Sequence, residues 1–174
     1  MGEFVIAVDV GGTNIRAALL NEQLEIIKKE TAFTADFPSA DSFLEQLTYM
    51  IKKVDPGHEA RCLGMALPAP WSDRNAVVTD ITNVPCLEGL LVETICRRLE
   101  GYEISIENDV NVIALLESDR GAAREFKNSL YVTVSTGISS GIIINNKIYH
   151  GAHGYAGEIG SIIISRSRDG IFYN

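Results

Sequence analysis

The 174-residue sequence contains no apolar run long enough to cross a membrane, and its first residues do not form a basic, cleavable leader. It is also short of positive charge, with 15 Lys and Arg against 23 Asp and Glu and a net charge of −8. Nucleic-acid surfaces need clustered Lys and Arg, so this balance disfavours them, although a small anion can still be held by backbone amides. We expect a cytoplasmic globular protein with no nucleic-acid and no membrane partner.

Cysteine is scarce, and its three positions, Cys62, Cys86 and Cys96, are scattered along the chain. The number is odd, and the spacings are not those of a metal site. The sequence therefore predicts reduced, mostly buried thiols, as in proteins of a reducing compartment.

What the sequence does contain is a succession of apolar strands and amphipathic helices. Three strand-like segments follow one another at short spacing and predict an antiparallel meander, at 4–10, 15–21 and 24–34. Helices are expected at 39–54, 87–99 and 110–124. Strands are expected between them at 61–70 and 103–109. After residue 129 the sequence predicts a strand, a glycine turn and a second strand, followed by a tight Asn145-Asn146 hairpin. This order predicts an α/β fold with a mixed sheet that begins with an antiparallel corner.

A glycine turn with an acid at its mouth, DVGGTNIRAA (9–18), joins the first two strands. Gly11 and Gly12 have no Cβ, so a phosphate can approach the backbone amides there, and Thr13 and Asn14 add side-chain donors. Asp9 repels phosphate, so it fits only if a divalent cation lies between the two. The alternative is an ordinary hairpin turn with local side-chain caps, and the spacing alone does not choose between them.

A second segment, VSTGISSGIII (134–144), repeats this pattern of strand, small-residue turn and strand. Ser135 and Thr136 would supply donors, and Gly137 would allow close approach. Two such hairpins from related halves can face each other across a cleft, each with an anion-binding concavity of amides.

Two polar residues, Asn108 and Asp109, stand where a predicted strand ends and a helix begins. Ligands of open α/β sheets bind at the carboxyl ends of strands. A carboxylate there can accept the proton of a substrate hydroxyl as it attacks a phosphoryl group. Capping of the following helix is the alternative, but it explains only one of the two residues.

The segment GAHGYAGEIG (151–160) has four glycines in ten residues, and Glu158 is its only charge. A carboxylate between glycines can hydrogen-bond sugar hydroxyls, although a solvated loop acid is the commoner case. His153 is expected to be a loop hydrogen-bonding group, because no partner has metal-ligand spacing.

Taken in this order, DVGGTNIRAA, ENDVN, STGISSGIII and GYAGEIG resemble the ROK family of sugar kinases and sugar-responsive repressors, over about residues 4–161. That family belongs to the hexokinase, Hsp70 and actin superfamily. The resemblance implies a ribonuclease-H-like, actin-type ATPase lobe in residues 1–118 and the start of a second lobe in 119–174. It also implies ATP and Mg²⁺ as cofactors. The implied reaction is glucokinase-like transfer of the γ-phosphoryl group to a hydroxyl of a hexose or N-acetylhexosamine.

The resemblance assigns roles by position. The first phosphate motif matches Asp9, Gly11, Gly12, Thr13 and Asn14. The second phosphate motif matches Thr136 and Gly137. Asp109 matches the catalytic base, and the sugar-binding positions match Asn83, Asn108, Asp109 and Glu158.

The sequence departs from that family at three places. Ser135, Ser139 and Ser140 stand where the second phosphate motif has glycines. Ser161 replaces a zinc-binding histidine, and residues 162–174 contain no cysteine-rich zinc motif, so no zinc is expected. The sequence also ends where a second lobe has just begun. Its apolar strand edges then need cover, which predicts a homodimer or a missing C-terminal half.

Three functions remain open from the sequence. These are a sugar kinase, a sugar-sensing binding module, and a catalytically inactive fragment of a ROK protein. The repressor branch carries a helix-turn-helix ahead of the first strand. Here that strand begins at residue 4, so DNA binding in cis is not expected. The sequence does not determine which sugar is bound, nor whether this chain is active by itself.

Overall fold

A computed structural model describes residues 3–72, 74–135, 137–166 and 172–173. Its contacts divide the chain into two compact units. Unit 1 comprises Met1–Ala69 and Asp73–Asp109, and unit 2 comprises Pro70–Ser72 and Val110–Asn174. The boundary expected after residue 118 lies at the far end of helix α3 (Asp109–Asp119), most of which the contacts place in unit 2.

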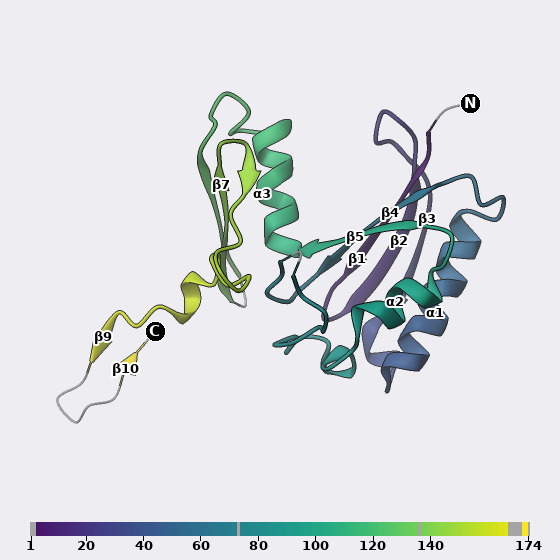
Figure 1. Cartoon of the computed structure of the whole chain (residues 1–174), viewed down its shortest axis with the longest axis horizontal. Coiled ribbons are helices and arrows are strands. Elements are labelled where there is room, and N and C mark those ends of the chain that lie inside the picture. The colour runs from purple at the N-terminus through teal and green to yellow at the C-terminus, as the bar shows by residue number, and fades with distance from the viewer. Residues whose placement is uncertain (1–2, 73, 136, 167–171, 174) are drawn as a thin grey trace. The chain divides into compact units, whose positions relative to one another are not determined.

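Unit 1 is built on a five-stranded mixed sheet in the order β3-β2-β1-β4-β5 (Figure 1). Its strands are β1 (Val5–Val10), β2 (Asn14–Leu20), β3 (Ile26–Phe33), β4 (Cys62–Leu67) and β5 (Glu103–Asn108). The first three strands pair antiparallel, and β4 and β5 run parallel to β1. The predicted α/β class, with an antiparallel corner and then alternating helices and strands, is confirmed.

One face of this sheet forms the core with the helices α1 (Ala40–Val54) and α2 (Val92–Arg98). Alternate residues of β1, Ile6, Val8 and Val10, point into this core and are almost fully buried. The side of α1 that faces them carries the buried residues Phe43, Leu44, Leu47, Met50, Ile51 and Val54. The helix begins where the Ser39 side chain accepts a hydrogen bond from the Ser42 amide at 3.2 Å, as its polar first turn predicts.

The opposite face of the sheet carries Asp9, the acid at the start of the predicted phosphate turn. The strand register places Arg16, Asp9, Ala66 and Glu107 in one row across β2, β1, β4 and β5. Because residues in register share a face, these four side chains lie on the side away from α1. The alternation along β1 therefore separates Asp9 from the core residue Val10.

Helix α2 is shorter than the predicted helix 87–99, because the segment before it makes a series of turns. Ile81, Val84, Leu87 and Leu90 are buried at a spacing of three residues. Within this segment Pro85–Leu87 forms one turn of 3₁₀-helix, and Gly89 has a φ of 79°, which an α-helix does not allow. Burial of these four side chains decided the conformation over local helix propensity.

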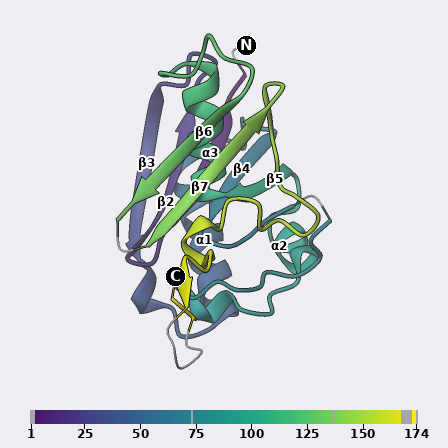
Figure 2. The same cartoon turned by 90° about the vertical axis from the view of Figure 1, so that its left-hand side faces the viewer.

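Unit 2 contains α3 and a three-stranded antiparallel sheet of β6 (Ser129–Val134), β7 (Ile138–Ile144) and β8 (Lys147–Ile148), with β6 and β7 side by side in Figure 2. Helix α3 packs closely on β7, since a Cβ at Gly141 would lie 3.0 Å from the Val110 carbonyl oxygen. The predicted Asn145-Asn146 hairpin is confirmed, with φ values of 53° and 62°. A short pair, β9 (Ser165–Arg166) and β10 (Phe172–Tyr173), follows.

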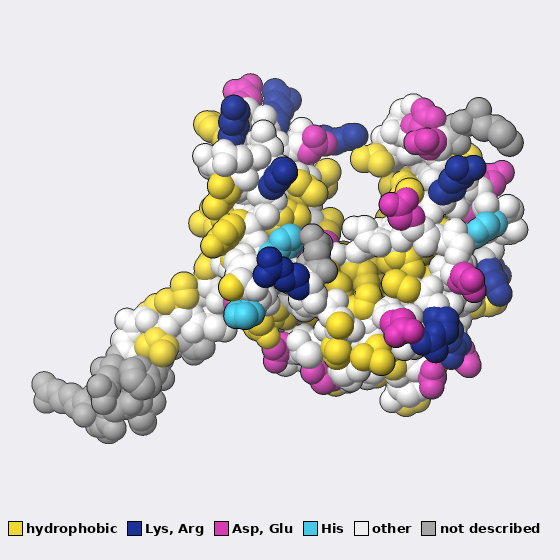
Figure 3. Space-filling model, in the orientation of Figure 1, with side chains coloured by type: hydrophobic (Ala, Val, Ile, Leu, Met, Phe, Trp, Pro, Cys, Tyr) yellow, Lys and Arg dark blue, Asp and Glu magenta, His cyan; other side chains and the backbone are white. Residues whose placement is uncertain are grey.

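Unit 2 exposes many apolar side chains, which gather on its surface in Figure 3. On one face of the sheet Leu130 is 58% exposed and Val134 is 74% exposed. The Ile162–Ile164 run lies outside any strand and is also exposed. Among the residues described, no helix is long and apolar enough to span a membrane.

The prediction of mostly buried cysteines is wrong. Cys62 and Cys96 are exposed, and Cys86 is half-buried. Cys62 begins β4 on the sheet face away from the helices, a placement that composition does not reveal.

Candidate functional site

The first glycine turn closes on itself between β1 and β2. The Gly11 amide donates to the Asn14 carbonyl oxygen at 2.9 Å, so it is not available to a ligand. Within the described part of the chain, the amides of Gly12 and Thr13 donate to no other group. The turn therefore offers two backbone donors to an anion, fewer than the sequence suggested.

Gly12 lies directly against Asn83. A Cβ at Gly12 would lie 3.2 Å from both the Cβ and the carbonyl oxygen of Asn83, closer than most such contacts. The absence of a side chain at Gly12 thus lets the predicted phosphate turn meet the predicted sugar loop. The two segments also line a shared open pocket of about 540 Å³, whose other lining residues are Thr34, Ala35, Phe37, Pro38, Val84, Pro85 and Cys86.

The Asn83 loop is held by its neighbours. Ile81 and Val84 on either side are buried, while Asn83 itself is exposed. The Ile81 amide donates to the Glu88 carboxylate at 3.1 Å, and the Val84 amide donates to the Ile81 carbonyl at 3.1 Å. These buried neighbours and hydrogen bonds fix the backbone on both sides of Asn83, while its side chain stays exposed.

Asp9 forms an ion pair with Arg16 across β1 and β2. The Arg16 Nη1 lies 2.7 Å from the Asp9 Oδ2, and the two side chains are 46% and 51% exposed. Arg16 was not among the site residues predicted from the sequence, although its position opposite Asp9 follows once the hairpin register is known. The pair places a positive charge beside the carboxylate that the sequence assigns to a divalent cation.

Asn108 and Asp109 lie at the carboxyl edge of the same sheet. Asn108 is 8% exposed, and its Nδ2 donates to the Ala69 carbonyl oxygen at 3.0 Å, which ties the end of β5 to the loop after β4. Asp109 is the first residue of α3. Because β5 is two strands from β1, Asp109 stands roughly 10 Å along this edge from the glycine turn.

The predicted residues of unit 2 are described within that unit only. Gly137 lies in the turn between β6 and β7, where the Ser135 amide donates to the Gly137 carbonyl at 2.9 Å. A Cβ at Gly137 would meet nothing within 4 Å, so packing does not demand glycine there. Thr136 lies outside the described residues.

Glu158 lies half-buried in the glycine-rich loop, which packs on the backbone of β7. The Ser140 amide donates to the Gly157 carbonyl oxygen at 2.8 Å, and a Cβ at Gly157 would overlap the Ser140 carbonyl oxygen. The glycine beside Glu158 therefore serves this close approach. His153 is exposed on the same loop.

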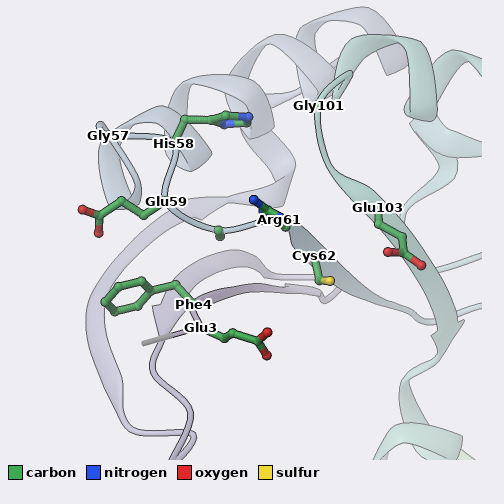
Figure 4. Close-up of a pocket in the computed structure, with 10 residues that line it drawn as sticks. Glu3, Phe4, Gly57, His58, Glu59, Arg61, Cys62, Gly101 and Glu103 are labelled. Carbon is green, nitrogen blue, oxygen red and sulfur yellow. The ribbon is translucent and has the colours of Figure 1, made fainter. Parts of the chain in front are cut away.

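A larger pocket, of about 1150 Å³, opens at the amino ends of β1, β4 and β5 and contains none of the predicted site residues (Figure 4). Glu59 and Glu103 point in opposite directions in Figure 4, so these two carboxylates do not converge. Among the described residues, no three His, Cys, Asp or Glu side chains are grouped to hold a metal ion.

Cys86 gives a direct probe of the smaller pocket, because burial raises the pKa of its thiol. The thiolate is the reactive form, and a raised pKa leaves less of it at any given pH. We expect iodoacetamide at pH 8 to modify the exposed Cys62 and Cys96 before Cys86, with the Cys86 rate still rising above that pH. Peptide mass spectrometry over a time course measures all three rates. Equal rates would contradict the burial of Cys86.

Comparison with known proteins identifies the family. The family model described as "ROK family" matches residues 5–170. The chain belongs to the ROK family. Its fold is accordingly that of the ROK sugar kinases, the actin-like ATPase fold that the motifs predicted.

Individual relatives of this ROK chain are sugar kinases. It is 27% identical to the glucokinase of Thermotoga maritima over 160 residues, covering 92% of the chain and 50% of that protein. It is 30% identical to the N-acetyl-D-glucosamine kinase of Histophilus somni, covering 88% of the chain and 50% of that protein. A ROK glucokinase from Streptomyces griseus, solved with glucose and AMPPNP, matches with a TM-score of 0.78 and 28% identity, over 93% of the chain and 51% of that structure. The ROK chain thus spans about half the length of these relatives.

Proposed function

We propose that this chain carries the acceptor and first phosphate sites of an ATP-dependent sugar kinase, which phosphorylates a hydroxyl of a hexose or N-acetylhexosamine. The observation that carries the proposal is the gathering of Asp109, Asn108 and the glycine turn at the carboxyl edge of one sheet. Ligands of α/β sheets bind at that edge. The named sugar kinases among the relatives support the same reaction class.

In this proposal each residue has a distinct task. Asp109 accepts the proton of the attacking sugar hydroxyl, which requires its carboxylate to be ionised. Asn108, held by the Ala69 carbonyl, and Asn83, on its anchored loop, orient the sugar. The resemblance to ROK kinases assigns sugar binding to Glu158 and the second phosphate motif to Thr136 and Gly137.

The donor side fits a nucleotide phosphate. The two amides of Gly12 and Thr13 that have no partner in the described chain are suited to phosphate oxygens. Asp9, half exposed beside this turn, offers the oxygen ligand that Mg²⁺ prefers. When bound at this turn, MgATP would supply the phosphoryl group together with a metal charge that offsets the phosphates.

The test is an assay of ADP release with MgATP against a panel of hexoses and N-acetylhexosamines. Sugar-dependent turnover supports the kinase and names its substrate. No turnover with any sugar, from a folded sample, would contradict catalysis by this chain.

The second candidate is a sugar-binding regulatory module or an inactive ROK fragment. The observation that favours it is the presence of Ser135, Ser139 and Ser140 where the second phosphate motif has glycines. Calorimetric titration with the same sugars, compared with the ADP-release assay, separates the two candidates. A binding module binds sugar without releasing ADP, whereas a kinase does both.

The apolar face of β6 predicts association. Leu130, Val132 and Val134 are exposed together on this strand, and their contact with water is unfavourable. We expect light scattering to show a dimer, and Val132→Lys to shift it toward monomer, because a charge in an apolar interface is costly. A monodisperse monomer of the unaltered chain would contradict self-association. Phe126→Lys, also exposed but outside the strand, is the matched control.

A further inference from the structure

Thr34 is a buried polar residue that the sequence did not single out. It follows β3 in a single 3₁₀ turn (Thr34–Asp36), and it is 5% exposed. Its hydroxyl donates to the Gly11 carbonyl oxygen at 2.6 Å, and its backbone amide donates to the Thr13 carbonyl oxygen at 2.9 Å. Thr34 therefore forms hydrogen bonds to the carbonyl oxygens of both residues that flank Gly12.

These two bonds constrain the direction of the turn's amides. In a planar trans peptide the N–H points away from the C=O of the same unit. Fixing the Gly11 carbonyl toward Thr34 therefore aims the Gly12 N–H to the opposite side. Gly12 is free to rotate in the absence of such a bond, because glycine tolerates many backbone conformations.

We propose that Thr34 is a positioning residue for phosphate binding, which fixes the Gly12 amide toward the nucleotide. This inference rests on the proposed function. Thr34 does not touch the reacting atoms in this role, but its hydroxyl preorganises a donor that an unbraced glycine turn would have to order on binding. Preorganisation of that kind lowers the entropic cost of binding a ligand.

The experiment compares Thr34→Val, which keeps the size but removes the hydroxyl, with Thr34→Ser, which restores it. The matched control is Thr48→Val on α1, where the hydroxyl donates to the Leu44 carbonyl oxygen at 2.7 Å, far along the chain from the turn. Calorimetry with the full chain measures affinity for MgATP, for inorganic tripolyphosphate and for the sugar found in the panel. Tripolyphosphate isolates the phosphate contacts from those of adenosine.

We expect Thr34→Val to weaken MgATP and tripolyphosphate binding about fivefold to tenfold, the effect of one hydrogen bond, and to leave sugar affinity within about twofold. Thr34→Ser should recover most of the loss, and Thr48→Val should show none. A purely structural role would lower stability and all affinities together. If Thr34→Val does not fold, Thr34→Ala takes its place, since it also removes the hydroxyl donor.

Unchanged tripolyphosphate and MgATP affinity in Thr34→Val would overturn the inference while leaving the kinase proposal intact. Failure of the unaltered chain to bind either phosphate ligand would overturn both. The two failures are distinguished by the behaviour of the unaltered chain.

Discussion

Replacing Asp109 with asparagine is expected to reduce sugar-dependent ADP release by about 10²–10⁴-fold, the range for loss of a general base. The amide has nearly the same shape as the carboxylate, but it cannot accept the proton of the sugar hydroxyl. Because Asn108 remains held by the Ala69 carbonyl, sugar affinity should stay within about threefold. The loss should therefore fall on kcat and leave KM for the sugar nearly unchanged.

The matched control is Asp119→Asn, at the last residue of the same helix. Asp119 lies in an exposed pair with Arg120 at 3.1 Å, so its loss should leave both kcat and sugar affinity unchanged. Steady-state kinetics and calorimetric sugar titrations measure the two quantities separately. Equal activity of Asp109→Asn and the unaltered chain would remove Asp109 from catalysis, and loss of sugar binding in parallel with kcat would make it a binding residue.

Asp9→Asn is expected to lower kcat/KM for MgATP by more than about 10²-fold, because a metal ion that neutralises phosphate charge contributes several kcal/mol. The loss in stability should be small. The Asp9–Arg16 pair is about half exposed, and exposed pairs contribute roughly 0.2–1 kcal/mol. Activity measured against Mg²⁺ concentration, together with thermal unfolding, tests both parts.

Arg16→Gln separates the ion pair from the metal. It breaks the same 2.7 Å contact but keeps the Asp9 carboxylate, so we expect its Mg²⁺ requirement to be near that of the unaltered chain. Asp41→Asn, which breaks an exposed pair with Arg98 at 3.1 Å, controls for loss of a surface charge. If Arg16→Gln and Asp9→Asn lose activity equally, the pair itself is what matters and Asp9 does not hold a cation.

Much of the fold is predictable from local pattern. The apolar run of β1, the spacing of Phe43, Leu47 and Met50 in α1, and the Asn145-Asn146 turn each depend on residues close in sequence. Such patterns depend on short-range sterics and on the burial of one face. They can therefore be recognised without knowledge of the rest of the chain. The same holds for the order of motifs that indicated the ROK family.

The short α2 shows where local pattern fails. Residues 87–99 have helical propensity, but Leu87 and Leu90 are buried in turns within unit 1. The exposure of Cys62 was mispredicted for a similar reason, because it depends on which face of the sheet is covered by a helix.

The sequence by itself determined the fold class, the family and the positions at which polar residues end the strands. Only the tertiary structure decided which of them meet: Gly12 against Asn83, Asn108 bonded to Ala69, and Thr34 bonded across to the Gly11 carbonyl. The physical reason is that strand ends distant in the chain are brought together by sheet order and register, which arise from packing of the whole core. The periodicity of apolar residues shows which face of a strand is buried, but it does not show which strand lies beside it.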